Sequence, residues 1–319
     1  MAGPPIWCTV RRSHPVKTVP LDIPRSSAAS GNSTDTIRGI AWMLLCVAGL
    51  TCVIISARAL KTDMDPLQLL FWRALIGLLL ITLILAPRGF RGVRTQRFGL
   101  HVVRNLFHLG GQFGVFFAFI VIPLAEITAV EYTIPAMTAL IAAIFIGEKV
   151  GIHRWTGMAV SFVGVLIVVR PGFAEVPPEM LILFGGALCF AINNVIMKVM
   201  TRTESAETMV FNMNLIQTIV AVGPALYVWT NPEWHHVPWI LGLGVAGMVA
   251  HYAMGRALTL ADTSVCFPLD FLRLPFVAVT AWLLWGETFS PWTAVGAAVI
   301  FGSQYYAVWR ETREAKKRD

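Results

Sequence analysis

Long apolar stretches separated by short polar breaks fill almost the whole chain after residue 36. Each stretch approaches the roughly 20 apolar residues that a helix needs to cross a bilayer. The breaks hold turn-forming pairs such as Asp65-Pro66 and Asn231-Pro232, and short connections of this kind join antiparallel neighbours. The pattern therefore predicts an all-α polytopic membrane protein with ten transmembrane helices, at 37–56, 66–86, 99–121, 124–147, 153–170, 179–200, 207–229, 237–258, 263–286 and 291–309.

The composition supports a membrane protein and argues against a soluble one. Hydrophobic residues make up 56% of the chain and charged residues only 13%, whereas soluble domains carry roughly 25% charged residues. The net charge of +7 would suggest a nucleic-acid partner in a soluble protein. In a membrane protein, Lys and Arg collect in cytoplasmic loops, so no nucleic acid is expected. The five cysteines form no CxxC pair or His/Cys cluster, so neither a metal nor a cofactor is indicated.

The distribution of positive charge predicts the orientation. With a cytoplasmic N-terminus, 19 of the 25 Lys and Arg residues fall in cytoplasmic segments and three (Arg58, Lys61 and Arg170) in outer loops. This asymmetry is the positive-inside pattern and places both termini in the cytoplasm. The Pro- and Ser-rich residues 1–36 are expected to be a disordered tail, although a start codon assigned too far upstream would look the same, and residues 311–319 a basic cytoplasmic tail.

The two halves of the chain repeat one another. Ile146-Gly147-Glu148 ends the fourth stretch, Trp285-Gly286-Glu287 ends the ninth, and a glycine follows each glutamate nine residues later. The chain is thus predicted to contain two five-helix units, 37–172 and 178–310. Because five is odd, the second unit must be inverted relative to the first. Inverted repeats place a binding site near the membrane midplane, at the repeat interface.

Several segments resemble the drug/metabolite transporter superfamily, specifically its EamA type. They are Phe71-Trp72-Arg73, residues 123–135 (PLAEITAVEYTIP), Gly147-Glu148-Lys149 and residues 164–172 (GVLIVVRPG). The resemblance covers nearly everything after residue 36, and it is stronger in the first half. It implies two inverted EamA repeats and the transport of a metabolite. Residues 94–104 resemble the branch that contains S-adenosylmethionine and riboflavin transporters.

Two acids occupy equivalent positions in the two halves. Glu131 precedes Glu148 by 17 residues, and Asp270 precedes Glu287 by 17. Each lies seven residues inside its stretch, about 10 Å deep at 1.5 Å per residue. We expect Glu131 in the outer half and Asp270 in the inner half of the membrane, one on each side of a central cavity. Such acids are candidates for cation binding or proton uptake, and interior polar struts are the alternative.

Arg273 lies three residues after Asp270, on the same helical face. Two interpretations remain open. Arg273 and Asp270 neutralise each other, or Arg273 binds an anionic group of the substrate, for which a guanidinium is well suited.

Other polar and aromatic residues within the apolar stretches are weaker candidates for substrate binding or coupling. They are Asn193, Asn194, Gln112 and His251, with Trp42, Tyr132 and Phe271 as possible walls of a pocket for a planar substrate. Each also has a structural interpretation as an interhelical hydrogen bond or a packing residue. Arg73 is expected to be structural. Pro135, Pro268 and Pro275 are expected to bend the helices near the two acids.

These observations favour a secondary transporter of small amino-acid-like, nucleoside-like or flavin-like metabolites, with alternating access and proton coupling, in the bacterial inner membrane. A channel or a flippase for lipid-linked substrates is the alternative. The chain has no HExxH, GxSxG or GxxxxGK[ST] motif, so we predict neither an enzyme nor a nucleotide-driven pump. The expected partners are a small-molecule substrate, the bilayer and protons, and Gly-rich helix faces would suit either internal packing or a homodimer.

Overall fold

A computed structural model of the protein describes residues 33–90, 93, 95–145, 152–170, 177–200, 203–260, 269–270, 272–288 and 290–318. Within these ranges the regular elements are all helices, as the apolar pattern predicts. They are α1 (Ser33–Ala59), α2 (Pro66–Leu85), the 3-10 helix η1 (Ala86–Arg88), α3 (Phe98–Ala118), α4 (Leu124–Glu131), α5 (Ile134–Phe145), α6 (Ile152–Val169), α7 (Pro178–Met200), α8 (Ala206–Tyr227), α9 (Val237–Leu260), α11 (Arg273–Trp285) and α12 (Pro291–Arg318).

Each of the ten expected stretches contains at least one helix, and local sequence explains several of the boundaries. Asp65 caps α2 by accepting a hydrogen bond from the Leu67 amide at 2.9 Å, and Pro66 fills the first helical position. Ser205 caps α8 in the same way through the Thr208 amide at 3.1 Å. These side chains satisfy amide groups that a helix start leaves without an intrahelical partner.

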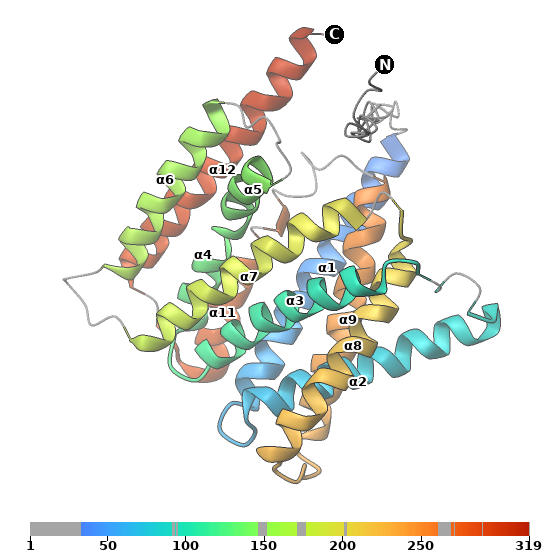
Figure 1. Ribbon diagram of the computed structural model, residues 1–319. Helices are drawn as coiled ribbons and strands as arrows, with labels where there is room; N and C mark the ends of the chain where they lie inside the picture. The colour runs from blue at the N-terminus through green and yellow to red at the C-terminus, as the bar shows by residue number, and fades with distance from the viewer. Residues whose placement is uncertain are drawn as a thin grey trace, which may run out of the picture.

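The two ends of the described chain differ from expectation. The first helix begins at Ser33, inside the segment 1–36 that we expected to be disordered, and residues 1–32 lie outside the described residues. The last helix runs on to Arg318 through the expected basic tail. Glu, Arg, Ala and Lys are strong helix formers, so a polar sequence can extend an apolar helix into water. The start of α1 and the end of α12 lie at the same end of the molecule (Figure 1).

Among the described residues, six helices are long and apolar enough to cross a membrane. They comprise α1, α2, α4 with α5, α7, α8 and α9. Of the other expected spans, α6 and α11 are apolar but shorter, whereas α3 and α12 are long but more polar. The polarity of α3 comes from side chains that are buried in the protein, as described below. Ten spans therefore stay a prediction.

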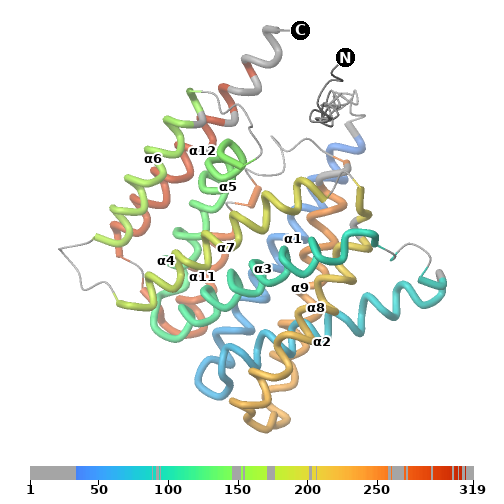
Figure 2. The backbone as a smooth tube through the Cα atoms, in the orientation of Figure 1, coloured from blue at the N-terminus to red at the C-terminus, as the bar shows by residue number. Residues whose placement is uncertain are grey.

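The main helix pairs join the first half of the chain to the second. The helices α1 and α9 pack along one another, as do α3 and α7, α6 and α12, and α2 and α8. The α6–α12 pair stands at one edge of the molecule and the α2–α8 pair near the opposite edge (Figure 1). The backbone trace shows α3 and α7 side by side between these edges (Figure 2).

Small residues allow these pairs to approach closely. At the α3–α7 crossing, a Cβ atom added to Gly114 would lie 2.8 Å from the Gly186 Cα, so only glycine fits. At the α6–α12 crossing, a Cβ on Gly164 would lie 2.9 Å from the Gly296 carbonyl oxygen. Packing through small residues is the usual way for helices to associate in lipid, and Gly114 serves it as expected from the sequence.

Candidate functional site

The fourth apolar stretch is broken where the sequence places its acid. Helix α4 ends at Glu131, and α5 begins at Ile134 with Pro135 in its first turn. This confirms the expected effect of Pro135 on the helix. In the second half, residues 269–270 are helical and α11 begins at Arg273, with Pro275 in its first turn. Pro268 lies outside the described residues.

The two breaks bring four polar side chains together into what we call the paired cluster, which consists of Glu131, Tyr132, Asp270 and Arg273. One guanidinium nitrogen of Arg273 lies 3.5 Å from Glu131 Oε2, and another lies 3.8 Å from Asp270 Oδ2. The exposed fractions of the side chains are 10% for Arg273, 11% for Glu131 and 24% for Asp270. Charges so shielded from solvent interact more strongly than they would in water.

Tyr132 ties the two breaks together. Its hydroxyl donates to the Asp270 carbonyl oxygen at 3.2 Å and accepts from the Leu274 amide at 3.1 Å. The Arg273 guanidinium carbon lies 5.5 Å from the centre of the Tyr132 ring, a cation–π distance. Phe271, the other predicted pocket residue nearby, lies outside the described residues.

The paired cluster corrects one expectation about the acids. We expected Glu131 and Asp270 on opposite sides of a cavity, but both contact the same arginine. The expectation treated the two stretches as continuous rods, and the breaks let their central ends converge. Of the two interpretations of Arg273, pairing with Asp270 is the one observed, and Glu131 is a second partner.

A second group of buried polar residues, here called the cationic cluster, consists of Arg73, Arg104, His108, Asn193, Gln217 and His251. It gathers side chains from α2, α3, α7, α8 and α9. The Arg104 Nε donates to Asn193 Oδ1 at 3.3 Å, and Asn193 donates to Asn194 Oδ1 at 3.1 Å. The cluster therefore contains the predicted candidates Asn193 and His251, with Asn194 at its margin.

Two histidines extend the cationic cluster. The Gln217 amide lies 2.6 Å from His108 Nδ1, and His251 Nδ1 lies 2.8 Å from the Gly247 carbonyl oxygen, to which it donates. The two imidazole rings are 5.8 Å apart and nearly perpendicular. Both histidines lie within electrostatic range of Arg73 and Arg104.

Sequence reasoning missed the two arginines as a pair, although α3 carried a usable signal. Its polar residues His101, Arg104, Asn105, His108 and Gln112 recur at helical spacing and are all buried. A polar stripe on a helix in a membrane protein faces other protein rather than lipid. Gln112, predicted to lie near a cavity, is on this stripe.

The predicted pocket aromatic Trp42 packs against α9. It is half-buried on α1, and its ring packs edge-on against Tyr252 of α9 at 5.9 Å. It also packs against a hydrophobic cluster of α1 and α9 side chains that Leu269, next to Asp270, contacts as well. The packing interpretation is therefore the one that the contacts of Trp42 support.

Contacts between the two halves close one end of the helix bundle. Arg58, at the end of α1, pairs with Glu287 just beyond α11 and donates to the carbonyl oxygens of Phe119 and Ile122. The other Glu287 oxygen accepts from the Leu124 amide at 3.3 Å, at the start of α4. Burial, followed by the charge of Arg58, lowers the pKa of the neighbouring Lys61 ammonium from its ordinary value.

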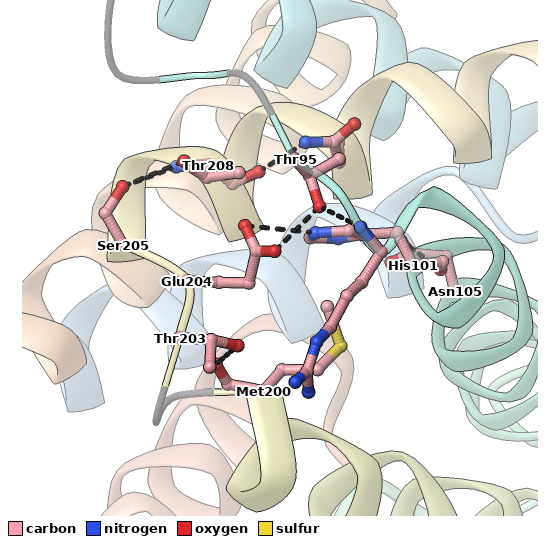
Figure 3. Close-up of polar contacts among 10 residues, drawn as sticks. Thr95, His101, Asn105, Met200, Thr203, Glu204, Ser205 and Thr208 are labelled. Carbon is pink, nitrogen blue, oxygen red and sulfur yellow. Dashed lines mark hydrogen bonds and ion pairs between the residues drawn. The ribbon is translucent and has the colours of Figure 1, made fainter.

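A different network lies at the other end, between the segment before α3 and the connection from α7 to α8. Figure 3 shows the Glu204 carboxylate facing both Thr95 and His101. The Thr95 hydroxyl donates to Glu204 Oε1 at 2.7 Å, and His101 Nε2 lies 3.7 Å from Oε2. This network also joins the first half of the chain to the second.

A 410 Å³ cavity lies beside Tyr132 between α4, α11 and α12. Its other lining residues are almost all apolar, including Leu274, Ala278 and Phe301. This composition suits a hydrocarbon better than a polar metabolite, so we do not assign the substrate to it.

The six long apolar helices and the polar side chains buried between them fit a polytopic membrane protein. The profile of the EamA-like transporter family matches residues 37–170 and again residues 177–309. The chain therefore belongs to this family, within the drug/metabolite transporter superfamily, which confirms the resemblance found in its sequence.

Curated relatives of this chain are also named as transporters. The S-adenosylmethionine uptake transporter of Rickettsia bellii is 24% identical over 280 residues, covering 88% of this chain and 96% of its own. The riboflavin transporter of Vibrio cholerae is 27% identical over 289 residues, with the same coverage. A solved crystal structure covers 88% of this chain and 99% of its own with a TM-score of 0.62. At 19% identity, it supports the fold alone.

Proposed function

We propose that this protein is a secondary transporter that moves a small metabolite across a bacterial inner membrane by alternating access. The names of its relatives support a metabolite of the S-adenosylmethionine or riboflavin kind. The central observation is that polar residues from both halves meet in the interior, with further contacts between the halves at each end. A carrier of this type needs a site between two units and ends that open in turn.

The contacts that join the two halves at each end of the bundle fit a cycle of alternating access. Arg58 with Glu287 joins the halves at one end, and Thr95 and His101 with Glu204 join them at the other. Each set consists of a few ion pairs and hydrogen bonds. Contacts of this size can break and re-form with modest changes in free energy, about 1–3 kcal/mol each. We propose that the two sets open alternately.

The paired cluster is the proposed coupling site. Two carboxylates share one guanidinium, so the ionised cluster carries one excess negative charge. Uptake of one proton by Glu131 or Asp270 would neutralise this excess. Protonation would also weaken the hold of Arg273 on one of the two broken helices, which links the proton to helix movement.

Transport by reconstituted protein tests this assignment. We expect the Glu131→Gln variant to transport S-adenosylmethionine or riboflavin at least about tenfold more slowly under a proton gradient, equivalent to about 1.4 kcal/mol. Glu207→Gln is the control, because Glu207 is exposed in the first turn of α8. Full gradient-driven transport by Glu131→Gln would remove this acid from the coupling mechanism.

A flippase for lipid-linked substrates is the second candidate, since a flippase needs a basic site for phosphate and the cationic cluster contains two arginines. Saturable exchange of a water-soluble substrate across sealed vesicles would favour the carrier. Movement of a lipid between leaflets would favour the flippase, and single-channel currents would favour a channel.

A further inference from the structure

Arg73 and Arg104 are buried charges that have no acidic partner among the described residues. Their exposed fractions are 6% and 4%. They lie seven and six residues from the first residues of α2 and α3, about 10 Å along each helix. Removing a charge from water costs several kcal/mol unless an opposite charge and hydrogen bonds compensate.

The partners of Arg104 are neutral and few. Its Nε donates to Asn193, and its Nη2 lies 3.8 Å from the thioether sulfur of Met213, a weak acceptor. Its Nη1 is buried and has no hydrogen-bond partner among the described residues. The guanidinium of Arg104 therefore has unused donors directed into the protein interior.

Arg73 approaches α9 at a glycine. A Cβ atom added to Gly247 would lie 3.1 Å from Arg73 Nε, so any larger residue there would crowd the guanidinium. The Gly247 carbonyl already accepts from His251, one turn further along α9. Within the described part of the chain, Arg73 has no hydrogen bond or ion pair.

Among the described residues, the surroundings of the two arginines supply no negative charge. His108 and His251 lie near both arginines, and the remaining members of the cationic cluster are the amides Asn193 and Gln217. Among the described residues, no carboxylate lies within ion-pair distance of Arg73 or Arg104. The charge balance at this site is incomplete without an anion.

We propose that the cationic cluster binds an oxyanion of the transported metabolite, a carboxylate or a phosphate monoester, with Arg73 and Arg104 as its charged ligands. A guanidinium presents paired donors that match two oxygens of either group. The amides from the second half and the arginines from the first would then hold one ligand between the halves. This inference rests on the proposed transport function and narrows its substrate to an anionic class.

The test uses two pairs of probes that differ in one anionic group. S-adenosylmethionine is compared with its decarboxylated form, and flavin mononucleotide with riboflavin. Binding to the purified full chain is measured by thermal shift, since a ligand stabilises the state that it binds. We expect the member with the anionic group to bind about tenfold or more tightly than its partner in at least one pair, because hydrogen bonds to a charged acceptor are stronger than neutral ones.

The variants Arg73→Gln and Arg104→Gln should reduce this preference to about onefold, whereas Arg73→Lys and Arg104→Lys should retain part of it. Arg38→Gln is the control, because Arg38 is exposed on α1 and pairs with Asp35, away from the cationic cluster. A preference for the carboxylate pair or the phosphate pair identifies the oxyanion. Acetate and inorganic phosphate, at high concentration, test the isolated groups.

Equal binding of both members in each pair would overturn the proposal, and so would a preference that survives in both glutamine variants. A failure of all probes, acetate and phosphate included, to stabilise the protein would also overturn it. Counterflow of labelled probe in vesicles reports transport separately. Anion binding without counterflow would refute the transport function and leave the anion site in place. Counterflow of only the members that lack the anionic group would support transport and refute the anion site.

Discussion

The two buried polar clusters differ in how their arginines are compensated. In the paired cluster, Arg273 has two carboxylates within 4 Å, together with the face of Tyr132. In the cationic cluster, Arg104 contacts only an amide and a thioether among the described residues, Arg73 has no hydrogen bond there, and two histidines lie near both arginines. A buried arginine that is paired with carboxylates stabilises the fold. A buried arginine that has no such partner is available to bind a ligand. Arg73, Arg104 and Arg273 are buried to a similar degree, so the two clusters differ in the partners of their arginines and not in burial.

Removal of the paired arginine should have the largest effect on stability. Arg273→Met leaves Glu131 and Asp270 buried without a counter-charge. We expect the free energy of unfolding to fall by about 3–5 kcal/mol, the usual cost of breaking a buried ion pair from one side. Thermal unfolding of the purified protein measures the change.

The same variant carries its own control. Adding Glu131→Gln and Asp270→Asn to Arg273→Met removes the uncompensated charges, so most of the lost stability should return. A triple variant that is no more stable than Arg273→Met would contradict an electrostatic origin for the effect.

A smaller effect is expected at the end of the bundle. Glu287→Gln keeps an oxygen for the Leu124 amide but removes the charge that pairs with Arg58. We expect a loss of about 1–2 kcal/mol, because Arg58 loses one charged hydrogen bond but keeps the carbonyl oxygens of Phe119 and Ile122 as acceptors. Thermal unfolding measures the change. A loss as large as that of Arg273→Met would show that the ion pair at the end of the bundle contributes as much stability as the paired cluster in the interior.

Opening of that end can be followed separately. In Glu287→Gln, a cysteine introduced at Ala125, which is buried on α4, should react faster with a water-soluble thiol reagent. An unchanged rate relative to the same cysteine in the parent protein would show that the Arg58–Glu287 contact does not control access.

Much of the fold could be predicted from sequence because the apolar pattern is strong and local. Each predicted stretch contains a helix, and the break near Pro135 was expected from the chemistry of proline. Membership in the EamA-like family could be predicted as well, from short segments such as Phe71-Trp72-Arg73.

The arrangement of the sites was harder to predict because it depends on contacts between distant segments. Glu131 and Asp270 are 139 positions apart and meet only because two helices are interrupted. We expected Arg73 to be structural, because the sequence of its own helix does not show whether an acidic side chain from another helix faces it. That no carboxylate of the described residues lies near Arg73 and Arg104 becomes visible only when five helices are assembled around them.

The central claim is that Arg73 is uncompensated in the ligand-free protein whereas Arg273 is compensated. The most direct test is to compare the thermal unfolding of Arg73→Met and Arg273→Met in the absence of ligand. Replacing a buried charge that lacks a partner with an apolar residue of similar length should be neutral or stabilising, by up to about 4 kcal/mol. We therefore predict that Arg73→Met unfolds at or above the temperature of the parent protein, while Arg273→Met unfolds well below it. An equal and large loss of stability in both variants would contradict the account.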